Sequence, residues 1–460
     1  MNPNTSHLAD FEPAQLAGKT YVTRLRAGRI DAATMLTVVV ALICLVPVGQ
    51  VLPGMTGVGR PGLVVGLVLC GWWVLVRFAP HLVVTGPQPM RWALLAFVSA
   101  ALLSYAAGSV RGLTTLEING ANRALLFYGT LAGVILVAAD GLTNWQRLQV
   151  VLQSAVVCAA IMAVLGIIQY VTRVDIVAYI NIPGLEIKGE SLGFEERGAG
   201  VRVASTATHY IELAAVLALC LPFAIHLAHF AQKPVQRRVA LVCALLIGPG
   251  IGATISRTGI VAVALTALVL VPVWTWRTRY NIGVTAVGVI AALSVVNPGL
   301  ARTLFSLFDN PTDNSSIMAR SNRYPMVFEY FSQRPILGRG TGTFLTPQYP
   351  ILDNQWLGTL ISDGVIGVLT LAGLHLTALV LAVIAFRRST TQATRHLCAC
   401  LIATQIIAVA VGGTFDSMSF TTYATMIALM LGLCGAVWRL THQDVSVRTA
   451  TARGDSENAG

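Results

Sequence analysis

The sequence contains little charge for its length. Only 11% of its 460 residues are Asp, Glu, Lys or Arg, and 55% are hydrophobic, whereas soluble domains carry roughly 25% charged residues. Many apolar runs approach the ~20 residues that an α-helix needs to cross a bilayer. Because backbone N–H groups in hydrocarbon must be paired within their own segment, these runs are expected to be helices. The composition therefore predicts an all-α, polytopic integral membrane protein.

The polar connections lack cysteine, and no cleavable signal peptide is evident. All eight cysteines fall inside apolar runs, where a free cysteine behaves as a small hydrophobe: Cys44, Cys70, Cys158, Cys220, Cys243, Cys398, Cys400 and Cys434. Neither a disulfide framework nor a metal site is indicated, and we expect no cofactor. The polar first 30 residues are typical of a cytoplasmic leader before a retained helix.

The net charge of +11 does not indicate a nucleic-acid partner, because the basic residues are scattered between apolar runs. We predict about twelve membrane spans, at about 33–52, 62–80, 92–108, 123–139, 148–171, 208–230, 238–254, 258–276, 281–299, 356–386, 395–414 and 420–438. The connections on the side of both termini are all basic, which makes that side cytoplasmic by the positive-inside rule. This places the protein in the cell (cytoplasmic) membrane, in contact with membrane lipids.

The expected organisation is one membrane domain at 33–440, a cytoplasmic segment at 1–32 and a disordered cytoplasmic tail at 441–460. Two long outer connections, at about 172–207 and 300–355, are candidates for function because long loops are uncommon in compact domains. The second is a large extracytoplasmic loop that precedes the tenth helix.

Arginines in the outer connections are the first candidate site residues. Arg257 lies between two apolar runs, where an arginine is costly unless it reaches water, a carboxylate or a phosphate; the alternative is snorkelling to the headgroups. Residues 318–338 have an amphipathic pattern that predicts a helix on the outer surface. Arg320 and Arg323 would share one face of it and suit a phosphate, or form a solvated basic face.

The segment RPILGRGTGTFLTPQYPILDNQWLGTLISDGVIG, residues 334–367, holds the second group. Its glycines would let backbone N–H groups approach an anion, although the ending of a P-loop is missing. Asp353 either caps the tenth helix or acts as a general base in a partly dry site. Asp363 is a polar group in a costly place, so we expect it to have a partner, such as an arginine. Glu212, at the start of the sixth run, could pair with His209 or with an arginine.

Four elements resemble the O-antigen ligase and polymerase family of bacterial membrane glycosyltransferases. Asn354, nine residues, Gly364, two residues and Gly367 reproduce the spacing of a ligase signature, although Asp353 stands where the signature has histidine. The other three elements are 335–344 with Arg320 ahead of it, Ser256-Arg257 after a helix, and Arg202–Leu213, which lacks the family's glycine and phenylalanine.

The resemblance implies a GT-C-like, metal-independent glycosyltransferase. It would transfer or polymerise a glycan from a polyprenyl-diphosphate donor to an acceptor hydroxyl on a lipid or glycan at the outer face. Arg257 and Arg320 would bind the diphosphate, and Asp353 would orient or deprotonate the acceptor. The remaining substrate-binding candidates are Arg202, Arg323, Arg339, Asn354, Gly338, Gly340 and Gly342. The sequence shows no DxD-type carboxylate cluster for a divalent metal.

Two other functions remain open. A transporter or flippase would need ionisable residues near mid-membrane and broken helices at its substrate site. A non-catalytic scaffold would instead bind polysaccharide assembly proteins, which are also possible partners of an enzyme.

Overall fold

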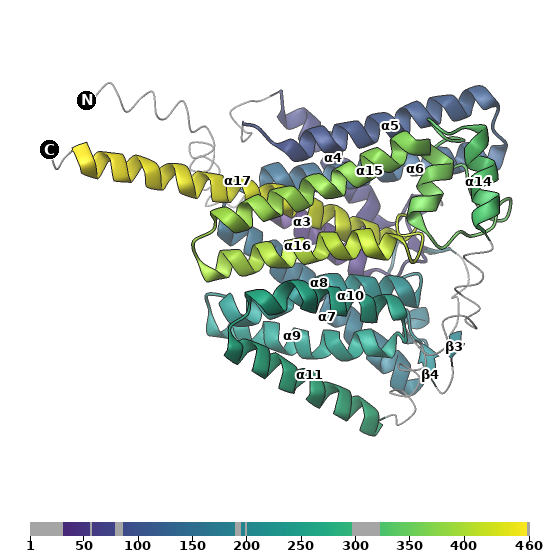
Figure 1. Ribbon diagram of the computed structural model, residues 1–460. Coiled ribbons are helices and arrows are strands. Elements are labelled where there is room, and N and C mark those ends of the chain that lie inside the picture. The colour runs from purple at the N-terminus through teal and green to yellow at the C-terminus, as the bar shows by residue number, and fades with distance from the viewer. Residues whose placement is uncertain are drawn as a thin grey trace.

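The computed structural model describes residues 31–55, 58–78, 86–188, 195–197, 200–296 and 323–457. Long helices lie side by side in a bundle (Figure 1). The helices are α3 (Ala32–Leu45), α4 (Pro61–Val76), α5 (Pro89–Arg111), α6 (Thr115–Gly141), α7 (Trp145–Thr172), α8 (Tyr210–Phe230), α9 (Pro234–Ala253), α10 (Arg257–Leu270), α11 (Trp276–Val296), α14 (Tyr324–Gln333), α15 (Gln355–Arg388), α16 (Gln392–Gly412) and α17 (Thr421–Glu457).

Each of the twelve predicted spans coincides with one of the described helices. The remaining described helix, α14, corresponds to none of these spans. Eight of the described helices are long and apolar enough to cross a membrane, and three shorter apolar helices accompany them: Ala32–Leu45, Pro61–Val76 and Arg257–Val273. The structure is thus that of a multi-pass membrane protein, as the composition predicted. That the chain crosses the membrane twelve times stays a prediction.

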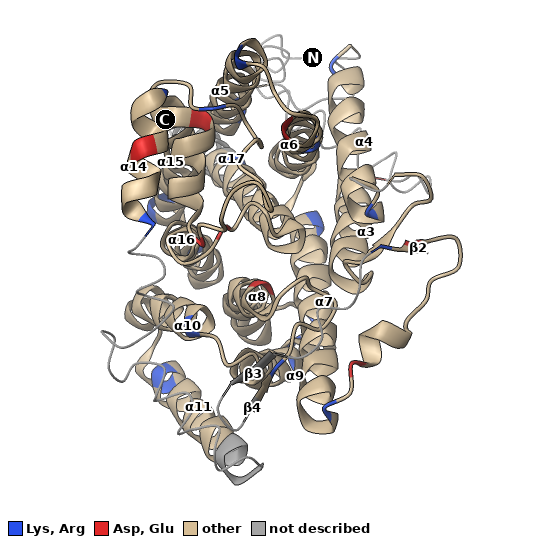
Figure 2. Cartoon of the chain, turned by 90° about the vertical axis from the view of Figure 1, so that its right-hand side faces the viewer, with Lys and Arg blue, Asp and Glu red and all other residues tan. Residues whose placement is uncertain are grey.

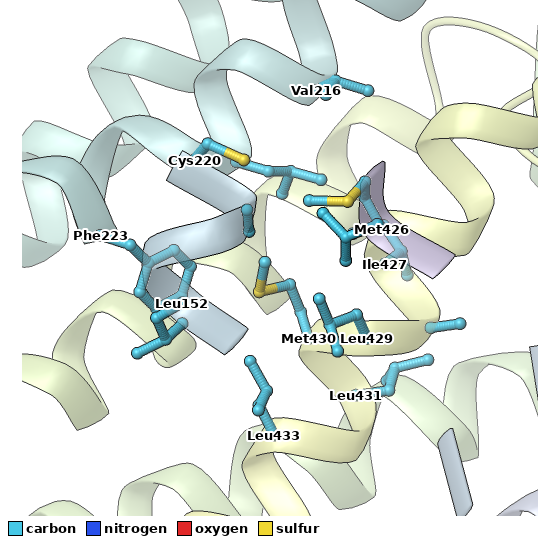
Figure 3. Packing of buried hydrophobic residues seen from close by; sticks show 14 of the residues in the cluster. Leu152, Val216, Cys220, Phe223, Met426, Ile427, Leu429, Met430, Leu431 and Leu433 are labelled. Carbon is cyan, nitrogen blue, oxygen red and sulfur yellow. The ribbon is translucent and has the colours of Figure 1, made fainter. Parts of the chain in front are cut away.

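Two helices form the centre of the bundle. The first 22 residues of α17 are almost entirely buried, as is most of α8. Figure 3 shows how Val216, Cys220 and Phe223 of α8 meet Met426 and Met430 of α17 in a continuous apolar core. The eight cysteines are all free, and all but Cys70 are fully buried, so they pack as small hydrophobes.

The two ends of the bundle differ. One end, here called the loop end, carries α14, the 3-10 turn η2 (Ile176–Tyr179) and two small antiparallel ribbons, β1 (Gln50–Val51) with β2 (Glu186–Ile187) and β3 (Glu195–Arg197) with β4 (Gly200–Arg202). The opposite end, here called the arginine end, carries the 3-10 turn η3 (Val271–Val273) and is where α4, α6 and α15 finish. The predicted amphipathic helix is therefore present in part, as α14 at the loop end, with Arg323 at its N-cap and not within the helix.

The last helix runs further than expected. α17 continues as a helix through Glu457 and projects beyond the bundle at the arginine end (Figure 1). This differs from the prediction of a disordered tail at 441–460. No glycine or proline occurs between Gly435 and Gly454, so no residue in that stretch forces the helix to stop.

Candidate functional site

Figure 2 looks directly onto the loop end. The helices that concern the candidate site, α8, α10, α15 and α17, all begin at this end. The N-terminus of an α-helix has unpaired N–H groups and carries a partial positive charge of roughly half a unit. A set of helix N-termini at one end of a bundle favours negatively charged groups there.

One short loop, residues 413–420 between α16 and α17, connects several of these helix starts. Asn354, just ahead of α15, donates from Nδ2 to the carbonyl oxygen of Gly413 at 3.2 Å. Thr258, in the first turn of α10, places its hydroxyl 3.3 Å from the hydroxyl of Thr414. The starts of α10, α15 and α17 therefore surround this loop, which we call the site loop.

Asp353 lies at the edge of the site loop with a distinctive backbone conformation. Its φ is +51°, in the left-handed region, and its side chain is 46% exposed with Oδ2 3.5 Å from Nη1 of Arg323. The cap of α15 is made by Asn354, whose side chain accepts from the N–H of Leu357 at 3.1 Å. The cap role that was open for Asp353 therefore belongs to Asn354, and the Asp353 carboxylate remains accessible.

The predicted arginines occupy different positions. Arg257 is the first residue of α10, next to Thr258, and so lies beside the site loop. Arg202 is buried, with its guanidinium 4.2 Å from the ring centre of Tyr210 and donating to the Tyr210 hydroxyl. Arg320 lies outside the described residues.

Arg339 belongs to a separate cluster near the start of α6. Its guanidinium stacks 4.8 Å from the ring centre of Tyr330, and Nη2 donates to the Tyr349 hydroxyl at 2.9 Å. That hydroxyl in turn donates to Glu117 at 3.2 Å, and Arg111 pairs with the same carboxylate at 2.7 Å. The structure thus gathers Arg257, Arg323, Asp353 and Asn354 around the site loop and gives Arg339 a packing role.

The glycine-rich segment fills a break in α15. At Gly364 the backbone leaves the helical region, with φ +67° and ψ −164°. Residues 335–340 supply the hydrogen bonds that the break removes: Val365 N–H to Pro335 O at 2.9 Å, Ile366 N–H to Ile336 O at 3.3 Å, Arg339 N–H to Ile361 O at 3.0 Å and Gly340 N–H to Ser362 O at 2.9 Å. In a membrane helix such groups must be paired within the protein.

This insertion explains two of the glycines. Gly338 has φ +70°, and a Cβ there would lie 2.3 Å from the carbonyl oxygen of Ser362; a Cβ at Gly364 would lie 2.3 Å from that of Ile336. Only glycine allows both the conformation and the approach. Because the N–H groups of Gly338 and Gly340 already donate within the protein, this geometry does not support them as phosphate donors.

Residues 240–372 match the O-antigen ligase family. The match supports the family assignment predicted from the sequence, and with it ligase-type glycan transfer by a membrane protein. It covers Arg257, Asp353, Asn354 and the break in α15. None of the curated proteins compared with the chain matches it.

Two acidic residues have partners that sequence reasoning did not identify. Asp363, inside the O-antigen ligase match, accepts from the hydroxyl of Thr341, so it has the expected partner, but this partner is a hydroxyl and not the suggested arginine. Glu212 accepts from the N–H groups of Thr422 at 2.8 Å and Tyr423 at 3.1 Å, the first turn of α17. Glu212 therefore joins the starts of α8 and α17 rather than pairing with His209 or an arginine.

Asp416 is a site residue that sequence reasoning missed. It lies in the site loop, outside residues 240–372, and accepts from the Ser419 hydroxyl. Burial raises the pKa of Asp416, the Ser419 hydrogen bond lowers it, and the charge of Asp353 raises it again. The Asp416 carboxylate therefore lies close enough to Asp353 for their charges to interact. No three His, Cys, Asp or Glu side chains among the described residues are placed to hold a metal ion.

Asp416→Asn is expected to raise the thermal unfolding midpoint at pH 7. The folded-state pKa of Asp416 lies above its ordinary value of 3.8, so stability present below that value is lost as pH rises through the folded-state pKa. Asparagine still accepts from Ser419 but cannot ionise. The difference in midpoint between variant and wild type should close as the pH falls below about 4. A difference that stays the same at every pH would contradict this origin.

Proposed function

We propose that the protein transfers or polymerises a glycan from a polyprenyl-diphosphate donor to an acceptor hydroxyl at the loop end, on the outer face of the cytoplasmic membrane. The fold would be GT-C-like, and no divalent metal would be needed. The observation that carries this proposal is the gathering of Arg257, Arg323 and Asp353 around the site loop.

The leaving diphosphate is the group that needs stabilisation. Negative charge develops on it as the sugar–phosphate bond breaks, and preorganised donors directed at that charge lower the barrier most. Guanidinium groups suit a diphosphate because each offers a planar fork of N–H donors. Arg257 and Arg323, helped by the nearby helix N-termini, would supply this positive charge. Arg320 and Arg202 complete the proposed set.

The acceptor hydroxyl needs a proton acceptor. We assign this role to Asp353, since its carboxylate is exposed and not used as a helix cap. Its ion pair with Arg323, at 3.5 Å, would bring the base close to the arginine that binds the diphosphate. Asn354 would keep the start of α15, and with it Asp353, beside the site loop through its hydrogen bond to the Gly413 carbonyl oxygen.

The break in α15 is the one feature of the site that a transporter would also use. Transporters expose unpaired backbone groups at such breaks to bind substrates. Here residues 335–340 pair with the broken turn on both sides, so those groups are occupied. This favours a rigid support for Asp353 and Asn354 over a transport site.

Reconstitution tests the reaction directly. Purified protein in liposomes is supplied with a polyprenyl-diphosphate glycan and an acceptor, with and without EDTA. Released polyprenyl diphosphate and transferred glycan are measured by mass spectrometry. We expect turnover to continue with the chelator, and loss of turnover under EDTA would overturn the metal-independent part of the proposal.

Arg257→Ala is expected to lower kcat by about 10²–10³-fold, the usual effect of losing one transition-state donor. Arg257→Lys should retain part of the activity, because it keeps the charge and loses the fork. Arg395→Ala is the control. Arg395 is an exposed residue at the arginine end, so the variant should behave as wild type. If Arg257→Ala retains full turnover while folded, the diphosphate is bound by other residues.

A further inference from the structure

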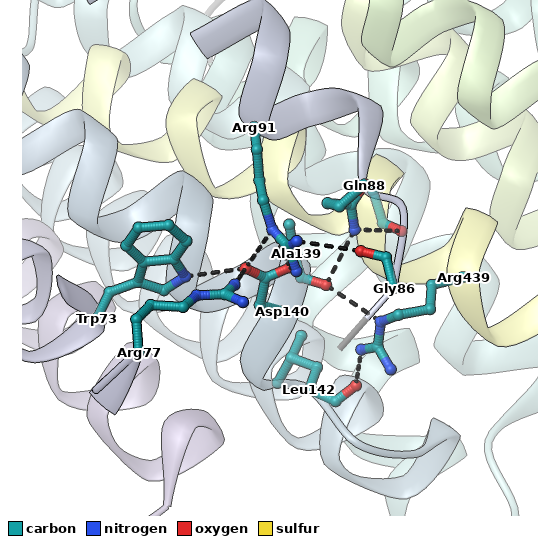
Figure 4. Close-up of polar contacts among 10 residues, drawn as sticks. Trp73, Arg77, Gly86, Gln88, Arg91, Ala139, Asp140, Leu142 and Arg439 are labelled. Carbon is teal, nitrogen blue, oxygen red and sulfur yellow. Dashed lines mark hydrogen bonds and ion pairs between the residues drawn. The ribbon is translucent and has the colours of Figure 1, made fainter. Parts of the chain in front are cut away.

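A second polar cluster lies at the arginine end, far from the site loop. Asp140, in the last turn of α6, accepts from Trp73 Nε1 at 2.9 Å, Arg77 Nη2 at 2.5 Å and Arg91 Nη2 at 2.8 Å. Figure 4 shows these side chains, from the ends of α4 and α5, pointing toward the same carboxylate. The carboxylate itself is almost fully buried.

A third arginine joins the cluster from α17. Arg439 donates to the backbone oxygens of Ala139 and Leu142, at the C-terminal end of α6 (Figure 4). It thereby satisfies carbonyl groups that a helix end leaves unpaired. Arg439 thus stabilises the end of α6, and the ion pairs of Asp140 are made by Arg77 and Arg91.

Positive charge exceeds negative charge in this cluster. Three guanidinium groups face one carboxylate and the roughly half negative charge of a helix C-terminus. Within the described part of the chain, no second Asp or Glu forms an ion pair with Arg77, Arg91 or Arg439. Arg77 Nε is also buried without a hydrogen-bond partner. A group with negative charge and several acceptor oxygens would complete the arrangement.

The surroundings indicate what kind of molecule carries that charge. The side chains of Arg77 and Arg91 are 27% and 24% exposed, so a ligand can reach both. Exposed apolar residues adjoin them in sequence: Phe78 and Leu75 beside Arg77, and Trp92 beside Arg91. A free anion would gain nothing from these apolar neighbours, whereas the acyl chains of a lipid would cover them.

We propose that Arg77 and Arg91 bind the phosphodiester of an anionic phospholipid, with its acyl chains lying along α4 and α5. The phosphate oxygens accept from guanidinium N–H groups that Asp140 and the Gly86 carbonyl leave unused, so Asp140 competes with the phosphate for these donors. Basic pockets at the ends of membrane helices are suited to such headgroups. This site is independent of the proposed transfer reaction and lies at the other end of the bundle.

Native mass spectrometry of the full-length protein tests the site. The purified protein is mixed with equal amounts of phosphatidylglycerol and phosphatidylcholine, and the retained lipids are counted. We expect preferential retention of phosphatidylglycerol, weakened about five-fold by Arg77→Gln or Arg91→Gln, as each arginine is worth about that factor near an anionic surface. Arg387→Gln, an exposed arginine at the same end, should leave the preference unchanged.

Asp140→Asn separates a binding site from a purely structural ion-pair cluster. Removing the carboxylate frees both guanidinium groups, so phosphatidylglycerol should bind several-fold more tightly. If the cluster only stabilises the fold, this variant lowers the thermal unfolding midpoint and leaves lipid retention unchanged. Equal retention of both lipids by the wild type, or full displacement of phosphatidylglycerol by inorganic phosphate, overturns the proposal.

Discussion

Gly364→Ala is expected to destabilise the protein by on the order of 4 kcal/mol, in the range of the most damaging single substitutions. A side chain at φ +67° is strained, and its Cβ would lie 2.3 Å from the Ile336 carbonyl oxygen. The backbone must therefore move and lose hydrogen bonds between 335–340 and the broken turn of α15. The thermal unfolding midpoint in detergent measures the loss.

Two further variants make this prediction specific. Gly338→Ala should destabilise the protein to a similar extent, because its Cβ would lie 2.3 Å from the Ser362 carbonyl oxygen. It would therefore disrupt the same contact between residues 335–340 and α15. Gly373→Ala is the matched control within α15, since a Cβ there meets nothing within 4 Å. Alanine should stabilise an interior helical position by about 1 kcal/mol. If all three variants unfold at the same temperature, the insertion does not support α15.

The helical spans were predictable because their signal is local. Exposing an apolar run to water is unfavourable, and within the membrane its backbone N–H groups must be paired inside the run. Both requirements depend only on the residues of the run itself, so the positions of the helices followed from the sequence alone. The break at Gly364 did not, because glycine is common in membrane helices. The break is caused by the approach of Ile336 and Gly338 from another segment. The pattern of apolar residues along α15 contains no sign of such a contact.

The partners of polar residues were the weakest predictions for the same reason. The sequence suggested an arginine for Asp363, whereas the fold places Thr341 there. Glu212 lies three residues after His209 in the sequence, but it reaches the start of α17, which is far along the chain. Asp416 carried no motif and became a candidate only once the site loop was seen beside Asp353. Long-range packing decides these contacts.

Asp353→Asn is expected to lower kcat by about 10²–10⁴-fold, the usual contribution of a general base. The variant should fold normally. Asparagine tolerates the left-handed conformation that Asp353 adopts, and the cap of α15 comes from Asn354. Asn354→Ala provides the contrast, because it removes that cap and should cost about 1 kcal/mol of stability. Transfer assays and thermal unfolding of both variants separate catalysis from folding.

Asp353→His gives the sharpest test, since the ligase signature has histidine at this position. Asn, Asp and His are the residues most enriched at positive φ apart from glycine, so the backbone at Asp353 accepts both the residue found here and that of the signature. If this position supplies the base, Asp353→His should retain transfer, with its acid limb near the ordinary histidine pKa of about 6.5. Full activity in Asp353→Asn, with an unchanged pH profile in Asp353→His, would assign the proton transfer to another group, and Asp416 would be the first to examine.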